Sequence, residues 1–164
     1  MTAIQSGIKV AFKLNGAATE WTVDPGENLL EALRRQGWFG VKRGCDTGDC
    51  GACTVLLDGQ PVNSCEIFAA QIGGSDVLTI EGVAKDDVLD PLQEAFLEHG
   101  GVQCGYCTPG MILTAKWLLK ENPDPSEQAV RAALRGNLCR CTGYKKIVES
   151  VLAVAASRRM EVAK

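Results

Sequence analysis

Eight cysteines are the residues of this 164-residue chain best suited to metal binding or redox chemistry. They fall into two groups of four, separated by a long stretch without cysteine. The first group is Cys45, Cys50, Cys53 and Cys65, and the second is Cys104, Cys107, Cys139 and Cys141. So many thiols in a chain without an export signal indicate metal ligation, whereas structural disulfides would require an oxidising compartment.

The first group has C-x4-C-x2-C spacing, and its fourth member, Cys65, arrives from a later segment. This is the arrangement of plant-type [2Fe–2S] sites. Gly44, Gly48 and Gly51 flank the ligands, and glycine permits the close backbone approach by which N–H groups reach sulfur. Structural zinc is the alternative, but zinc sites usually show two C-x2–4-C pairs with a long spacer. The spacing favours an iron–sulfur cluster.

The second group combines C-x2-C with C-x-C. Cys107 and Cys141 are each followed by threonine and then by an amphipathic helical pattern. If the two helices run side by side, their N-termini converge on one metal centre, where the helix dipole favours thiolate. This spacing is less specific than that of the first group, and four thiolates suit zinc as well as iron.

Composition limits the remaining possibilities. The formal net charge is −3 and there is no basic block, so we expect no nucleic-acid partner. No apolar run reaches the roughly 18 residues of a membrane helix, and the first residues lack a signal-peptide pattern. We therefore expect a cytoplasmic protein without a membrane span. No serine–histidine set or glycine-rich phosphate loop is present, so we expect no substrate-transforming site in this chain.

The first half has strand patterns around one short helix. Apolar and polar residues alternate from Ile8 to Leu14, and Asn15-Gly16 predicts a hairpin. Leu29, Leu30 and Leu33 predict an amphipathic helix that ends at Gly37. Further strands are expected at residues 19–23, 54–57, 61–63 and 77–80. Residues 1–81 are thus predicted to form a small mixed sheet with one crossing helix.

The second half has helical patterns. Asp90-Pro91 with Gln93 is a capping signature, and Thr108-Pro109 opens another helix. Asp124 is expected to begin a third helix in the same way, and apolar residues from Ile147 to Ala155 mark a fourth. Four helices of similar length with short connections predict a small bundle for residues 82–164.

Three segments resemble one known family. They are GCDTGDCGACT (44–54), VQCGYCTPG (102–110) and GNLCRCTGY (136–144). Together they resemble the iron–sulfur subunit of the molybdenum hydroxylases, the xanthine oxidase family, over about residues 8–155. The resemblance implies an α+β protein with a β-grasp, ferredoxin-like [2Fe–2S] domain followed by a four-helix bundle that binds a second [2Fe–2S] cluster.

The resemblance also implies partners. The second cluster would lie beside the molybdopterin cytosine dinucleotide of a large subunit, with Gln103 in contact with the pterin and Cys141 as the nearest ligand. The first cluster would face a medium FAD subunit, in a complex expected to be a dimer of heterotrimers. Electrons would pass from molybdenum through both clusters to FAD or another acceptor. A free two-cluster carrier and a structural zinc protein are the alternatives.

Overall fold

The computed structural model describes residues 7–162 of the chain. A five-stranded sheet has the order β2-β1-β5-β3-β4. β1 pairs antiparallel with β2 and parallel with β5, and β3 pairs antiparallel with β4 and β5. The strands are β1 (Ile8–Leu14), β2 (Ala17–Val23), β3 (Thr54–Leu57), β4 (Gln60–Asn63) and β5 (Asp76–Leu78). The mixed sheet predicted for the first half is confirmed.

Local sequence explains how these strands form. Alternation places Val10, Phe12 and Leu14 in the core while their neighbours face outward. Asn15 and Gly16 both adopt positive φ, as a tight two-residue hairpin turn requires. The sheet therefore has one buried face, which helix α1 (Leu29–Arg35) helps to cover.

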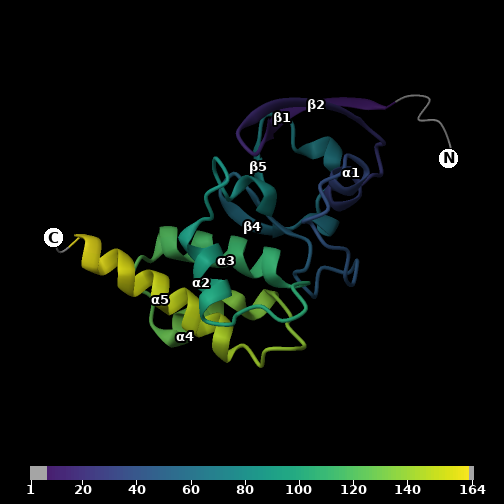
Figure 1. Cartoon of the computed structure of the whole chain (residues 1–164). Coiled ribbons are helices and arrows are strands. Elements are labelled where there is room, and N and C mark those ends of the chain that lie inside the picture. The colour runs from purple at the N-terminus through teal and green to yellow at the C-terminus, as the bar shows by residue number, and fades with distance from the viewer. Residues whose placement is uncertain (1–6, 163–164) are drawn as a thin grey trace.

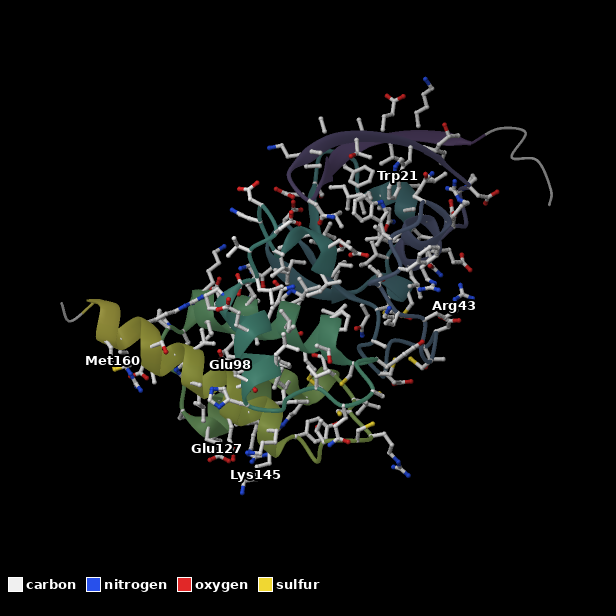
Figure 2. The ribbon with its side chains drawn as sticks, viewed as in Figure 1. Trp21, Arg43, Glu98, Glu127, Lys145 and Met160 are labelled. Carbon is white, nitrogen blue, oxygen red and sulfur yellow. The ribbon has the colours of Figure 1, made fainter. Side chains whose placement is uncertain are left out.

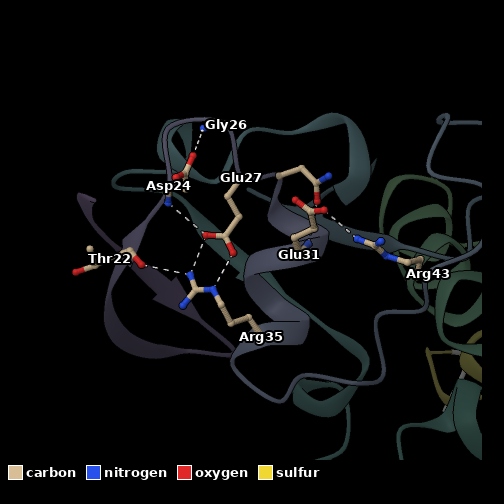
Figure 3. A network of polar contacts seen from close by, with 8 residues as sticks. Thr22, Asp24, Gly26, Glu27, Glu31, Arg35 and Arg43 are labelled. Carbon is tan, nitrogen blue, oxygen red and sulfur yellow. Dashed lines mark hydrogen bonds and ion pairs between the residues drawn. The ribbon is translucent and has the colours of Figure 1, made fainter. Parts of the chain in front are cut away.

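Helix α1 is fixed at its start and tied to the sheet by polar contacts. The Asn28 side chain accepts the Glu31 N–H as N-cap. Arg35 makes a two-pronged ion pair with Glu27 at 2.8 Å and also donates to the Thr22 carbonyl at the end of β2 (Figure 3). Because this guanidinium spans two elements, it sets the position of α1 against the strands.

The second half of the described chain is helical. Its helices are α2 (Pro91–Glu98), α3 (Thr108–Glu121), α4 (Glu127–Ala133) and α5 (Lys145–Val162). They lie together beside the sheet, and the outer hairpin β1–β2 is on the far side of the molecule (Figure 1). The capping box of Asp90 and Gln93 is confirmed, as is the start of α3 at Thr108.

Two expectations for the helices were wrong. The N-cap of α4 is Ser126, which accepts the Ala129 N–H, and Asp124 lies before the helix. The helices are not of similar length, since they contain 8, 14, 7 and 18 residues. Apolar stripes show where a helix has a buried face, but tertiary packing decides how far it continues.

Two hydrophobic cores meet at the middle of the molecule. One lies between the sheet and α1, and the other lies among the helices. Leu56 of β3 belongs to the helical core, and α3 packs against β3. Helix α3 is therefore the element that joins the two halves. Within residues 7–162, no helix combines the length and the apolar character that crossing a membrane requires.

Candidate metal centres

The first cysteine group lies on the loop between α1 and β3, together with the turn that follows β4. Pairing of Thr54 with Asn63 aligns β3 with β4, so Cys53 and Cys65 lie next to each other. The Cys53 carbonyl accepts both the N–H and the hydroxyl of Ser64, at 3.3 and 2.7 Å. A hairpin thus delivers the late ligand to the loop that carries the other three.

The loop curls so that its backbone amides face sulfur. The N–H groups of Thr47 and Cys50 point at the Cys45 Sγ at 3.4 Å each, and the Ala52 N–H points at the Cys50 Sγ at 3.5 Å. Such bonds stabilise thiolate and tune an iron–sulfur cluster. A Cβ on Gly44 would lie 2.5 Å from the Cys50 Sγ, so a larger residue there would require the Cys50 side chain to shift.

Arg43 anchors this loop to α1. Its guanidinium pairs with Glu31 of α1 at 3.0 Å (Figure 3) and with Asp46 at 3.5 Å. All three groups are exposed, so each pair adds little stability by itself. Their role is geometric, because they connect the start of the cysteine loop to a rigid helix.

The second cysteine group lies where two loops meet. Cys104 and Cys107 precede α3, and Cys139 and Cys141 precede α5. The Sγ atoms of Cys104 and Cys141 are 3.6 Å apart, and Cys107 lies next to Cys139. The structure thus brings all four thiols to the beginnings of α3 and α5, as the repeat in the sequence predicted. Figure 2 shows sulfur atoms gathered at the end of the molecule opposite Met160.

The thiols of the two groups differ in acidity. Contact with the side chain and N–H of Thr47, and then with the Cys50 N–H, lowers the pKa of Cys45 to about 6. Burial, then contact with Cys53, raises the pKa of Cys65 to about 12. Burial, then contact with Cys139, likewise raises the pKa of Cys107 to about 12. At neutral pH the first group therefore combines a thiolate at Cys45 with a protonated thiol at Cys65.

Cys139 shows how these effects compete. Burial raises the pKa of its thiol, but hydrogen bonds from the hydroxyl and N–H of Thr142 and from Cys141 outweigh it, so the pKa is lowered. The pKa of the Cys141 thiol shifts in the opposite direction. Its hydrogen bond to Cys104 raises the pKa of Cys141.

The arrangement of the thiols is pairwise. The contacts join Cys45 with Cys50, Cys53 with Cys65, Cys104 with Cys141, and Cys107 with Cys139. Within residues 7–162, no group of three or more His, Cys, Asp or Glu side chains is placed to hold a single metal ion. Two thiol pairs at each site fit a [2Fe–2S] cluster, which has two irons and four cysteine ligands.

Comparison with known proteins agrees with this geometry. Residues 12–77 match the 2Fe-2S iron-sulfur cluster binding domain, and residues 79–152 match the [2Fe-2S] binding domain. The chain is 52% identical to the nicotinate dehydrogenase small FeS subunit of Eubacterium barkeri, over 88% of this chain and 92% of that one. It is 46% identical to the xanthine dehydrogenase iron-sulfur-binding subunit of Escherichia coli O157:H7, over 88% and 92%.

A solved structure extends the comparison. The aldehyde oxidoreductase from Desulfovibrio gigas superposes with a TM-score of 0.89 at 44% identity, covering 94% of this chain and 17% of that one. The chain belongs to the iron–sulfur subunit family of the molybdenum hydroxylases. The family resemblance predicted from the three cysteine motifs is confirmed, and this iron–sulfur subunit carries two [2Fe–2S]-binding domains.

Contacts between the two sites of the iron–sulfur subunit escaped the sequence analysis. Buried Asn137 donates to the Gly51 carbonyl and to the Thr54 hydroxyl, both at 3.0 Å, and accepts the Thr114 hydroxyl at 2.9 Å. The Leu138 N–H donates to the Cys50 carbonyl at 2.8 Å. Asn137 lies inside a quoted motif, but nothing in the sequence indicates partners so far away in the chain.

Two further features close the space between the sites. A Cβ on Gly51 would lie 2.1 Å from the Gly136 carbonyl oxygen, and one on Gly110 would lie 2.5 Å from the Gly51 carbonyl oxygen. The Tyr106 hydroxyl donates to the Arg43 carbonyl, so the two cysteine loops also touch at the surface. Gln103, the residue expected to contact the pterin, is exposed beside Cys104.

Proposed function

We propose that this chain is the electron-transfer subunit of a molybdenum hydroxylase, and that the ligands of its clusters are the eight cysteines. Cys45, Cys50, Cys53 and Cys65 would hold the first [2Fe–2S] cluster. Cys104, Cys107, Cys139 and Cys141 would hold the second. The observation that carries the proposal is the arrangement of these thiols as two pairs at each of two sites.

The residues of the chain explain what each site needs. When bound, a [2Fe–2S] cluster accepts and releases one electron at a time. The amides of the first loop stabilise negative charge on sulfur, and the beginnings of α3 and α5 do so at the second site. Direct hydrogen bonds between the loops, such as that from Leu138 to Cys50, hold the two sites in fixed positions.

Exposure of the second site supports a route for the electrons. Cys104 and Cys141 are exposed, as is Gln103 beside them, so the second site is open to a partner. We assign this face to a large subunit that carries molybdopterin cytosine dinucleotide, with Gln103 toward the pterin. The first site then passes electrons to a medium FAD subunit or another acceptor.

The proposal extends to the organisation of the chain and of the complex. Two cores and two family matches support a division into residues 1–81 and 82–164, the second domain being a four-helix bundle. The chain matches only 17% of the D. gigas aldehyde oxidoreductase, which supports a larger partner for the remaining functions. We propose a cytoplasmic dimer of heterotrimers.

The test is metal analysis with EPR after dithionite reduction, on the wild type and on two cysteine variants. The wild type should contain four irons and four sulfides, as two clusters require, and show two signals. Cys65→Ala should remove one signal and Cys141→Ala the other, so each variant is the control for its partner. In the assembled complex, Cys141→Ala should also stop turnover while substrate still binds. Zinc in place of iron, or wild-type turnover of Cys141→Ala, would refute the proposal.

A further inference from the structure

We propose that the Thr142 hydroxyl donates a hydrogen bond to the sulfur of Cys139 and thereby raises the reduction potential of the second site. We further propose that Tyr144 is the positioning residue that holds Thr142 in place. The inference rests on the proposed function, because it requires Cys139 to be a cluster ligand. It adds the residues that set the potential of that cluster.

The hydroxyl and the sulfur are in direct contact. Thr142 Oγ1 lies 3.1 Å from the Cys139 Sγ, well within hydrogen-bonding distance for sulfur. A cysteine that ligates iron is a thiolate and carries no proton. The proton in this contact must therefore come from the threonine.

Tyr144 fixes the orientation of that hydroxyl. Its N–H donates to Thr142 Oγ1 at 3.1 Å, so one lone pair of the threonine oxygen is already occupied. The phenol oxygen of Tyr144 in turn accepts the Cys139 N–H at 2.9 Å. The three residues thus form a closed ring of hydrogen bonds. The Tyr144 phenol oxygen binds the backbone N–H of Cys139, and the Thr142 hydroxyl binds its sulfur.

The backbone of Tyr144 is strained to make this ring. Its φ is 68°, a left-handed conformation that is unfavourable for a bulky residue. The other non-glycine residues with positive φ among residues 7–162 are asparagine or aspartate, which tolerate it. Packing of the Tyr144 side chain against the helical core helps to hold its backbone in this conformation. Strain of this kind persists only where the surrounding structure enforces it.

The physical effect on the site is electrostatic. Reduction adds one electron to a cluster whose negative charge is shared with its sulfur ligands. A hydrogen bond donated to a ligand sulfur stabilises the reduced form more than the oxidised form, because the reduced form is more negative. The second site therefore accepts an electron more readily, and no bond to iron is made or broken.

The experiment is an EPR-monitored redox titration of the intact complex, with Thr142→Val, Thr142→Ser and Tyr144→Phe. Thr142→Val should shift the distribution of an electron between the two sites about tenfold toward the first, which is about 59 mV for a one-electron couple. Thr142→Ser keeps the hydroxyl and should restore the wild-type potential. Tyr144→Phe keeps the backbone N–H that bonds to Thr142 and removes only the phenol acceptor of the Cys139 N–H, so it should change the second potential less than Thr142→Val does. The first potential should not change in any variant.

Thr108→Val is the matched control, because Thr108 follows Cys107 as Thr142 follows Cys141. It should leave both potentials at their wild-type values. If Thr142→Val fails to hold iron at the second site, Thr142→Ala is titrated instead, with the same shift expected. An unchanged second potential in a variant with two EPR signals would overturn the inference. A wild type without a second iron–sulfur signal would instead overturn the proposed function.

Discussion

The side-chain nitrogen of Asn137 lies 3.0 Å from the carbonyl oxygen of Gly51, although 86 residues separate them in the chain. Gly51 lies between two proposed ligands of the first site, and Asn137 lies two residues before a proposed ligand of the second. One buried amide therefore joins the two loops that carry the cysteines. The distance between the sites depends on this contact and on the glycines packed around it.

Removing this amide should weaken the junction. Asn137→Ala removes three buried hydrogen bonds and leaves the Thr114 hydroxyl without its partner, and we expect a loss of about 3 kcal/mol of unfolding free energy. The Gly51 carbonyl still accepts the hydroxyl and the N–H of Thr54. The measurement is the urea midpoint by circular dichroism under anaerobic conditions. Asn122→Ala, at the exposed end of α3, is the control and should change the midpoint little. Equal midpoints for the two variants would show that packing alone holds the loops together.

Gly51→Ala should be more damaging than a glycine substitution elsewhere. The new Cβ would meet the Gly136 carbonyl oxygen, a backbone atom that cannot move without shifting the second loop. Gly16→Ala is the control, because Gly16 also has positive φ but no atom within 4 Å of a Cβ. We expect Gly16→Ala to cost about 1 kcal/mol in stability, the strain alone. Gly51→Ala should in addition lower iron content and change the first EPR signal, and normal iron loading would contradict the clash.

Arg35→Lys should loosen α1. A lysine cannot form the two-pronged contact with Glu27 while also reaching the Thr22 carbonyl, so we expect a loss of about 1 kcal/mol in thermal stability. Lys9→Ala breaks the exposed pair with Glu20 and should have almost no effect. Differential scanning calorimetry compares the two variants. If the two variants lower the melting temperature equally, the two-pronged ion pair of Arg35 with Glu27 is no stronger than an ordinary surface ion pair.

Removal of iron should expose the difference in thiol acidity. In iron-free protein, Cys45 is a thiolate above its pKa of about 6 and a protonated thiol below it, so its alkylation should rise through about pH 6. Cys65 and Cys107, with pKa values of about 12, should remain unreactive at pH 7. Mass spectrometry after iodoacetamide treatment reads each site. Protein alkylated in urea is the reference, and Cys45 following that reference curve would contradict the prediction.

The sequence could predict whatever depends on nearby residues. Cysteine spacing identified both groups, Asn15-Gly16 predicted its hairpin, and Asp90 with Gln93 predicted the start of α2. These features follow from local geometry and hydrogen bonding. The pairing of Cys45 with Cys50 could not be distinguished from other pairings, because spacing shows which thiols gather but not which of them touch.

Long-range contacts were out of reach for a different reason. Asn137 and Gly110 matter because of atoms that the fold brings to them from distant segments. The hydrogen bonds of Tyr144 to Cys139 and Thr142 depend on a backbone conformation that tyrosine does not favour, so local preference would not predict them. Fold and function could therefore be predicted from motifs, whereas the parts that set the spacing and tuning of the sites required the structure.

The contact between Asn137 and Gly51 joins segments that are synthesised at different times. All four proposed ligands of the first site emerge from the ribosome before the segment that carries Asn137 and Leu138 has been translated. The first loop is thus available to iron while the residues that later bury it do not yet exist. The second site depends on Cys139 and Cys141 and can be completed only near the end of synthesis. The order of synthesis therefore allows the first cluster to be inserted before the loop of the second site packs against the first loop.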